Sequence, residues 1–221
     1  MRIFLAGATG AVGKRLVPLL IDEGHEVVAM TRTAAKAEGL RAAGALPVVA
    51  DGLDREAVLG AVVGAQPDVI VHQMTALSGE TDLRHFDRQF ATTNRLRTEG
   101  TAHLLEAARA AGTRRLIAQS FTGWPFARTG GPVKDEEAPL DPEPPRAQRA
   151  SLAAIRELEA MVTGAGPAIE GVVLRYGGLY GPETSLSADG ELTALVRKRR
   201  LPVIGDGGGH MSFTHIDDAA R

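Results

Sequence analysis

Short apolar runs of strand length alternate along the chain with longer segments whose apolar residues recur at helical spacing. The apolar runs are Ile3 to Ala6, Val27 to Met30, Pro47 to Ala50, Val69 to Val71, Leu116 to Ala118 and Gly171 to Leu174. The helical segments between them are Ala11 to Glu23, Ala34 to Ala43, Asp54 to Val63, Phe86 to Ala111 and Ser151 to Thr163. This alternation is typical of a parallel sheet with helices on both faces, built from right-handed βαβ units. We therefore predict an α/β fold with a doubly wound parallel sheet.

Two stretches bear on how the chain is organised. The segment from Gly130 to Pro145 is dense in proline, glycine and acidic residues, which excludes a regular element. We expect this segment to be a surface loop over the cleft, and the longer loop from Gly123 to Pro145 to line the substrate pocket. The chain stops at Arg221, just where a helix begins, so we expect a truncation and a partial substrate-binding lobe over residues 176–221 after a main domain of residues 1–175.

The composition of the chain limits which classes of partner are expected. With 221 residues, 44% of them apolar, the chain can bury one generous core. The net charge of -2 gives no general attraction to nucleic acid, and no stretch approaches the roughly 20 apolar residues of a membrane span, so neither partner is expected. The absence of cysteine excludes a disulfide framework, a thiolate metal site and a cysteine nucleophile, and a reducing cytoplasm is the expected setting.

A glycine-rich turn follows the first strand and opens a helix. It reads Gly7-Ala8-Thr9-Gly10-Ala11-Val12-Gly13. In this pattern the first glycine permits the tight turn, the second lets the backbone approach a pyrophosphate, and the third lets helix and strand pack closely, while the helix amino terminus faces the anion. We predict a dinucleotide site at Gly7, Thr9, Gly10, Ala11, Val12 and Gly13.

The end of the second strand bears on which dinucleotide binds. In NAD-selective domains an acidic residue stands there, whereas this chain has Met30-Thr31-Arg32. Because Arg32 can pair with a 2′-phosphate and stack on adenine, we expect NADP more readily than NAD, with added charge from Lys36 or Arg41. Asp51 and Gly52 follow the third strand, where we expect them at the cofactor site. The Asp51 carboxylate is placed to accept a hydrogen bond from the adenine amino group, although it is equally suited to cap the next helix.

Further motifs resemble the short-chain dehydrogenase/reductase superfamily, in its extended epimerase/dehydratase branch. They are Pro67 to His72, Asn94 with Gly100 to Ala108, Leu174 to Pro182 and Phe213 to Asp218. The resemblance implies strand order 3-2-1-4-5-6, a cofactor across the carboxyl edge with Asn94 at its site, and a small-molecule substrate such as a carbonyl, hydroxyl or sugar-like compound. Family members often pair through two long helices, here near Asn94 to Ala111 and Ser151 to Thr163, so a homodimer is among the expectations.

The resemblance also implies a reaction centre of Tyr-x-x-x-Lys with an upstream serine or threonine. Ser120 falls at the serine position, with Thr122 as its substitute, but Ala147 and Ser151 stand where the family has tyrosine and lysine. The chain contains no Tyr-x-x-x-Lys at all. Tyr176 is expected beside the nicotinamide, and we group it with Ser120 and Thr122 as candidate catalytic residues.

Other proton donors and rival functions stay open at this point. His72, Arg149 and a water held by Ser120 are alternatives to Tyr176, although each residue also suits a structural role. No metal site is expected, because the spacing of His210, His215 and the nearby aspartates fits no tight ligand pattern. The chain is an atypical NADP(H) oxidoreductase, an NADP-sensing regulatory protein, or a non-redox isomerase or cyclase on the same fold.

Overall fold

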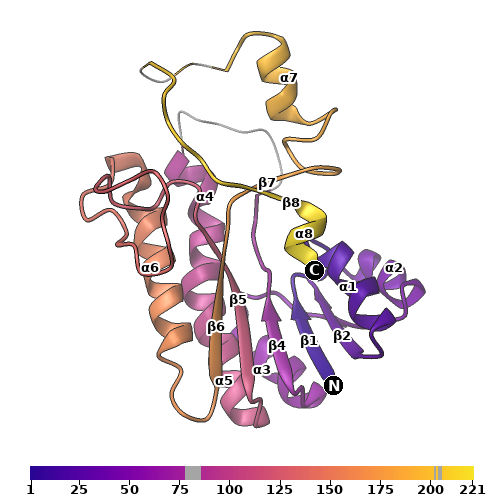
Figure 1. Cartoon of the computed structure of the whole chain (residues 1–221). Coiled ribbons are helices and arrows are strands. Elements are labelled where there is room, and N and C mark those ends of the chain that lie inside the picture. Colours follow the sequence, from indigo (N-terminus) through magenta and orange to yellow (C-terminus); the bar gives the residue numbers. More distant parts are fainter. Residues whose placement is uncertain (78–85, 202, 204–205) are drawn as a thin grey trace.

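Each predicted apolar run forms a strand of one parallel sheet in the computed structural model, which describes residues 1–77, 86–201, 203 and 206–221. The strand order is β3-β2-β1-β4-β5-β6, which confirms the predicted doubly wound topology (Figure 1). Every neighbouring pair is parallel. The strands are β1 (Arg2–Ala6), β2 (Glu26–Thr31), β3 (Leu46–Val49), β4 (Val69–His72), β5 (Arg115–Phe121) and β6 (Glu170–Tyr176).

The crossovers are helical, as the periodicity predicts. The helices are α1 (Gly13–Asp22), α2 (Ala37–Ala42) after a 3₁₀ turn (Ala34–Lys36), α3 (Arg55–Ala65), α4 (Phe86–Arg95), α5 (Thr101–Ala111) and α6 (Arg149–Thr163) after a second 3₁₀ turn (Arg146–Gln148). A π-helical turn (Leu96–Gly100) joins α4 to α5, so the single long helix expected from Phe86 to Ala111 contains a change of helical pitch. Such π-helical turns are often found at functional sites.

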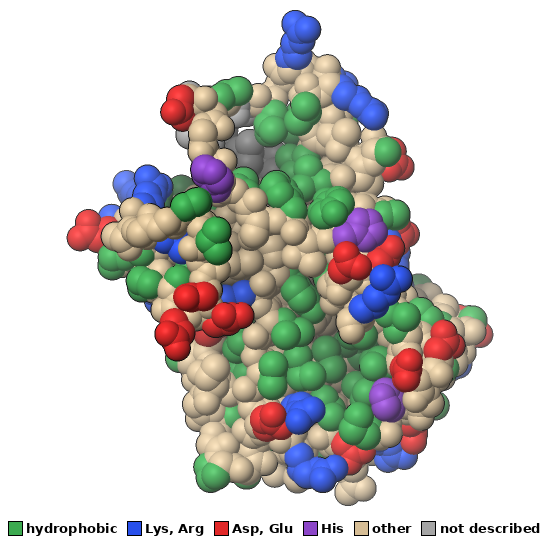
Figure 2. Space-filling model, in the orientation of Figure 1, with side chains coloured by type: hydrophobic (Ala, Val, Ile, Leu, Met, Phe, Trp, Pro, Cys, Tyr) green, Lys and Arg blue, Asp and Glu red, His purple; other side chains and the backbone are tan. Residues whose placement is uncertain are grey.

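Alternation along the strands divides the core between the two faces of the sheet. Phe4 and Ile70 pack on one face with residues of α3, α5 and α6. Leu5 and Val71 pack on the other face with residues of α1 and α2. In Figure 1, α1 and α2 lie beside β1 and β2, and in Figure 2 hydrophobic side chains gather over the sheet on the visible face. Leu174 of β6 is among the exposed hydrophobic residues.

The last part of the chain lies over the carboxyl edge of the sheet (Figure 1). It contains β7 (Gly178–Tyr180) and β8 (Phe213–His215), which pair in parallel as a separate two-stranded sheet, and the helices α7 (Glu191–Arg197) and α8 (Ile216–Ala220). Arg15 of α1 fixes this segment to the main domain, because its guanidinium binds the Asp217 carboxylate at 2.7 Å and the Pro182 carbonyl oxygen at 2.7 Å.

Residues 123–145 form no helix or extended strand, as the composition predicts. An isolated antiparallel bridge between Phe126 and Leu140 closes the segment on itself. Arg156 of α6 donates to the carbonyl oxygens of Leu140 and Asp141, and Arg175 of β6 donates to that of Glu136. These contacts hold the segment against α6 and the end of β6. Among the helices in the described ranges, none combines the length and apolar character needed to cross a bilayer.

Candidate functional site

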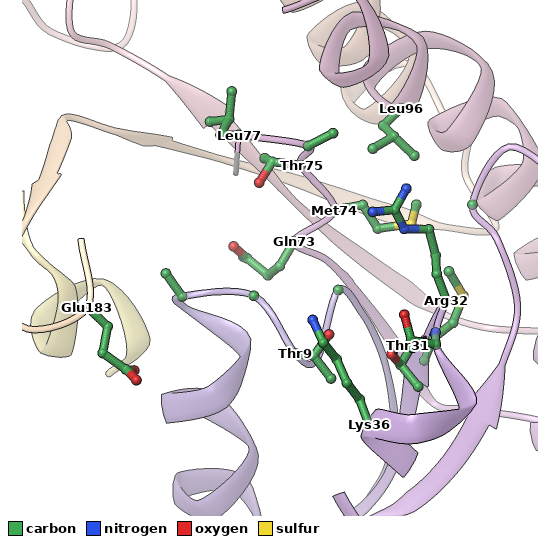
Figure 3. A pocket seen from close by; sticks show the side chains of 17 residues that line it. Thr9, Thr31, Arg32, Lys36, Gln73, Met74, Thr75, Leu77, Leu96 and Glu183 are labelled. Carbon is green, nitrogen blue, oxygen red and sulfur yellow. Dashed lines mark hydrogen bonds between the residues drawn. The ribbon is translucent and has the colours of Figure 1, made fainter. Parts of the chain in front are cut away.

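A cavity of about 380 Å³ opens where the glycine-rich turn meets the carboxyl ends of β1, β2 and β4 (Figure 3). This is the edge at which doubly wound sheets bind ligands, and β1 and β4 flank the point where the strand order reverses. The described residues that line it are Gly7, Thr9, Gly10, Ala11, Met30, Thr31, Arg32, Thr33, Lys36, Gly52, Gln73, Met74, Thr75, Ala76, Leu77, Leu96 and Glu183. The segment 123–145, which we expected to line a pocket over the cleft, contributes none of these residues.

The turn needs its glycines for the predicted reasons. Gly7 has φ +94°, a left-handed conformation, and a Cβ there would lie 2.6 Å from the carbonyl oxygen of Gln73. A Cβ at Gly13 would overlap the carbonyl oxygen of Gly7, so helix α1 and β1 can pack this closely only through glycine. At Gly10 a Cβ would meet only the Gly7 oxygen at 3.2 Å, which leaves its open side toward the cavity.

The amino terminus of α1 is suited to an anion. In the described ranges, the N–H groups of Ala11 and Val12 have no backbone acceptor, and they precede a ten-residue helix with its positive dipole end toward the cavity. Ala11 lines the cavity, whereas the Val12 side chain is buried against Ile216 and Ala220 of α8. Val12 can therefore contribute to a ligand only through its backbone.

Two cations project into the cavity from the end of β2 and the turn after it. Figure 3 shows Arg32 and Lys36 on the same side, next to Thr31. Arg41 instead pairs with Glu38 at 2.8 Å and does not line the cavity. Glu183 is the one carboxylate among the described lining residues, and it lies within 3.5 Å of Lys14 and Arg15. The cavity wall around β2 is therefore basic.

The two predicted cofactor residues after β3 lie in different surroundings. Asp51 accepts the backbone N–H of Leu53 at 3.0 Å and does not line the cavity, while Gly52 does. Asp51 is not the cap of α3 either, because Asp54 holds that position and accepts the N–H of Ala57. A Cβ at Gly52 would overlap the sulfur of Met74, so a larger residue there would require the Met74 side chain to move.

Asn94, another predicted cofactor residue, lies in a polar cluster beside α6. Its Nδ2 donates to the Ser151 hydroxyl at 3.1 Å, and its Oδ1 accepts from Arg97 at 3.3 Å. Both ends of the amide are thus engaged by the protein, and Asn94 is absent from the described lining of the cavity.

Gln73 is a site residue that sequence reasoning missed. It directly follows β4, is 5% exposed and extends into the cavity (Figure 3). Its Oε1 has no hydrogen-bond partner in the described structure. Because an unsatisfied buried acceptor is costly, this oxygen points to a donor on a bound molecule. A polar residue placed immediately after a buried strand was the available sequence signal.

Ser120 does not face the cavity. It is 2% exposed, and its hydroxyl donates to Oε1 of Glu159 at 2.6 Å. Glu159 also receives Nε and Nη2 of Arg175 at 2.9 and 2.7 Å, and Arg175 lies over the Phe126 ring. The hydroxyl predicted to bind a substrate carbonyl is therefore part of a buried ion-pair network with α6. Its substitute Thr122 donates its backbone N–H to the Tyr176 carbonyl oxygen and does not line the cavity either.

Tyr176 and His72 are also held by the protein. The Tyr176 hydroxyl donates to the Ala219 carbonyl oxygen at 3.0 Å, and burial raises the pKa of the phenol, an effect partly offset by Gln73. His72 is buried, and burial lowers its pKa to about 4. The N–H of Met74 donates to its Nδ1, and its Nε2 donates to the Leu96 carbonyl oxygen. His72 is thus a neutral core histidine.

The remaining polar candidates have local roles. Arg149 donates to the Pro144 carbonyl oxygen, and the side chain of His215 caps α8 by accepting the N–H of Asp217. Among the described residues, no three His, Asp or Glu side chains form a group that could hold a metal ion.

The sequence of the chain from residue 3 to residue 221 matches the family described as the NAD dependent epimerase/dehydratase family. The chain belongs to this family. The Thermus thermophilus UDP-glucose 4-epimerase, solved in complex with NAD, is similar in structure, with a TM-score of 0.71 and 25% identity over 100% of this chain and 72% of that one. The family and the fold support NAD(P) binding.

Two curated relatives are named as reductases. A 3-diazoavenalumate denitrifying reductase from a Streptomyces species is 50% identical over 99% of this chain and 69% of its own length. A 2-alkyl-3-oxoalkanoate reductase from Stenotrophomonas maltophilia is 29% identical over 100% of this chain and 63% of its own length. The chain thus spans roughly two thirds of these relatives, whose names support an NAD(P)-dependent, oxidoreductase-like role on small molecules.

Proposed function

We propose that this chain is an NADP(H)-dependent reductase whose substrate loses N₂ when it is reduced. The observation that carries the proposal is the pairing of a basic dinucleotide cavity with candidate acids that lie outside its lining, of which Ser120, Tyr176 and His72 are hydrogen-bonded within the protein. The cavity supports the choice of cofactor, and the candidate acids support the type of reduction.

The cavity fits the cofactor. The glycine turn leaves room that a Cβ would fill, the amino terminus of α1 offers N–H groups to the pyrophosphate, and the buried Oε1 of Gln73 lacks a donor. Arg32 and Lys36 would hold a 2′-phosphate, and no acidic residue at the end of β2 opposes it. The preference for NADP over NAD rests on these two cations, since a structural relative binds NAD.

The surroundings of the candidate acids distinguish a reduction that needs a proton donor from one that does not. Reducing a ketone creates an alkoxide that needs a proton, and a family-like acid would supply it. Here Ser120 donates to Glu159, Tyr176 donates to a carbonyl oxygen of α8, and His72 is neutral with both ring nitrogens engaged. The described structure therefore favours a reduction whose product needs no proton from a side chain of the protein.

Reduction of an aryl diazonium group is such a reaction. A bound NADPH supplies a hydride. The new C–H bond forms at the carbon that carries the nitrogen, and the C–N bond breaks with its electron pair leaving in N₂, so charge balances without a proton. The relative at 50% identity is named for denitrifying a diazo compound, and the names of both reductases denote carboxylate substrates. We propose a carboxylate-bearing diazo compound as the substrate class.

The test is turnover of 3-diazoavenalumate by the chain with NADPH deuterated at the transferring position. We expect NADPH oxidation, N₂ release and deuterium at the former diazo carbon, each above a protein-free control. Tyr176→Phe and Ser120→Ala should keep turnover within about threefold, because neither hydroxyl acts on the substrate. Preferential reduction of a 2-alkyl-3-oxoalkanoate, or NADPH binding with no turnover of either compound, would contradict the proposal, and the second result would favour a regulatory NADP-binding role.

A further inference from the structure

Arg97 is a buried cation that the described protein does not neutralise. The residue is 8% exposed and lies in the π-helical turn (Leu96–Gly100). In the described part of the chain its guanidinium makes one hydrogen bond, from Nη1 to Oδ1 of Asn94 at 3.3 Å, and this acceptor is neutral. Within residues 1–77, 86–201, 203 and 206–221, no carboxylate lies within ion-pair distance of it. Most of the five N–H donors of the guanidinium therefore have no acceptor among these residues.

Two other arginines of the chain have the carboxylate partner that Arg97 lacks among the described residues. Arg175 is also partly buried, and Glu159 receives it through two oxygens at 2.9 and 2.7 Å. Arg95, two residues before Arg97, is exposed and pairs with Glu99 at 2.7 Å. Burying a charge without a partner costs several kcal/mol in general, so native proteins pair such groups or use them for a ligand.

Arg97 stays charged despite its burial. Desolvation lowers the pKa of its guanidinium to about 10, which still leaves the cation protonated at neutral pH. The nearby His72 cannot neutralise it, because the imidazole is itself uncharged and can offer no negative charge. The positive charge is thus a fixed property of this part of the protein.

The location of Arg97 is the ligand-binding edge of the sheet. Its neighbour Leu96 lines the cavity, and the Leu96 carbonyl oxygen accepts Nε2 of His72 at the end of β4. Asn94, which accepts from Arg97, is bonded in turn to Ser151 at the start of α6. Arg97 therefore lies between β4 and α6, beside the point where the strand order reverses and where ligands of such sheets bind.

We infer that Arg97 binds the carboxylate of the substrate. The inference rests on the proposed function and assigns the anionic end of that substrate to this guanidinium. A planar guanidinium with unused donors suits bidentate recognition of a carboxylate, and low exposure strengthens the contact. The glycine turn, Arg32 and Lys36 are the groups proposed above for the cofactor phosphates, and Arg97 is not among the residues that line that cavity, so we take the substrate as the source of the anion.

The test compares avenalumate with its uncharged methyl ester, each titrated calorimetrically into the chain saturated with NADP⁺. We expect the carboxylate to bind more tightly than the ester, and Arg97→Met to lose about 10- to 100-fold in affinity for the carboxylate and little for the ester. Arg97→Lys should recover part of the loss. Arg95→Gln is the matched control, because it removes an exposed arginine of the same helical region, and it should leave affinity unchanged.

Stability and cofactor affinity supply independent readouts. If Arg97 is kept for a ligand, Arg97→Met should leave the ligand-free melting temperature unchanged or higher, whereas loss of a structural arginine would lower it. NADPH affinity should be the same in wild type and Arg97→Met. Equal binding of acid and ester, no binding of either, unchanged binding in Arg97→Met, or a selective loss of NADPH affinity would overturn the inference. Failure of wild type to bind NADPH would instead refute the proposed function.

Discussion

The network of Ser120, Glu159 and Arg175 leads to the most detailed prediction, because it separates a structural serine from a catalytic one. Glu159→Gln keeps the size of the side chain and removes its charge. Arg175, whose side chain is 22% exposed, then loses its counter-ion, and the buried Ser120 hydroxyl loses a charged acceptor. Removing one partner of a buried pair costs about 3–5 kcal/mol, and partial exposure places this pair at about 3 kcal/mol.

That loss is measurable in this chain. For a protein of this size each kcal/mol lowers the melting temperature by about 2–4 °C, so Glu159→Gln should lower it by about 6–12 °C. Ser120→Ala removes one hydrogen bond to a charged group and should cost about 2 kcal/mol. Urea unfolding of the single variants and of Glu159→Gln/Arg175→Met gives a double-mutant cycle, in which we expect a coupling of about 2 kcal/mol.

The functional readout is NADPH affinity and turnover of Ser120→Ala. Both should stay near wild type, since the hydroxyl points to α6 and not into the cavity. A coupling energy below about 0.5 kcal/mol would refute the network as a stabilising unit. A Ser120→Ala variant of normal stability with a large loss of turnover would restore the serine to the reaction and refute its structural assignment.

Two further predictions concern the core and the glycine turn. His72 has a pKa of about 4 in the folded chain against 6.5 when unperturbed, so it contributes stability that is fully present above pH 6.5 and is lost as the pH falls toward 4. The loss amounts to about 3 kcal/mol, and unfolding free energies of His72→Asn measured across this range should show a shallower slope than wild type. Gly13→Ala should destabilise by more than about 3 kcal/mol, because its Cβ would overlap the Gly7 carbonyl oxygen, while Gly39→Ala, with open space around it, should be neutral or stabilising in thermal unfolding. Equal melting temperatures for the two alanine variants would contradict the packing described at the turn.

The fold was largely predictable from the sequence, because strand and helix periods are properties of local stretches. All six strands and the order of the sheet followed from apolar runs, glycine positions and family resemblance. The π-helical turn (Leu96–Gly100) did not, since its apolar spacing resembles that of the flanking helices.

The site was predictable only in part. Gly7, Gly10 and Arg32 line the cavity as expected, because each occupies a fixed place relative to a strand end. The orientation of Ser120 could have been predicted: strand alternation places it on the same face as Leu116 and Ala118, which pack with Leu158 of α6. Gln73 had one local signal, its place directly after a buried strand, whereas Arg97 had none. The burial of both side chains depends on residues distant in sequence.

Fluorescence titration with NADPH and NADH tests whether the glycine turn and Arg32 form an NADP(H) site. We expect wild type to bind NADPH more tightly than NADH. Arg32→Ala should lose about 10- to 100-fold in affinity for NADPH and little for NADH, and Arg41→Ala should change neither affinity. Equal affinity for the two dinucleotides, unaffected by Arg32→Ala, would contradict the assignment of the 2′-phosphate site. Binding of neither would contradict the cofactor site as a whole.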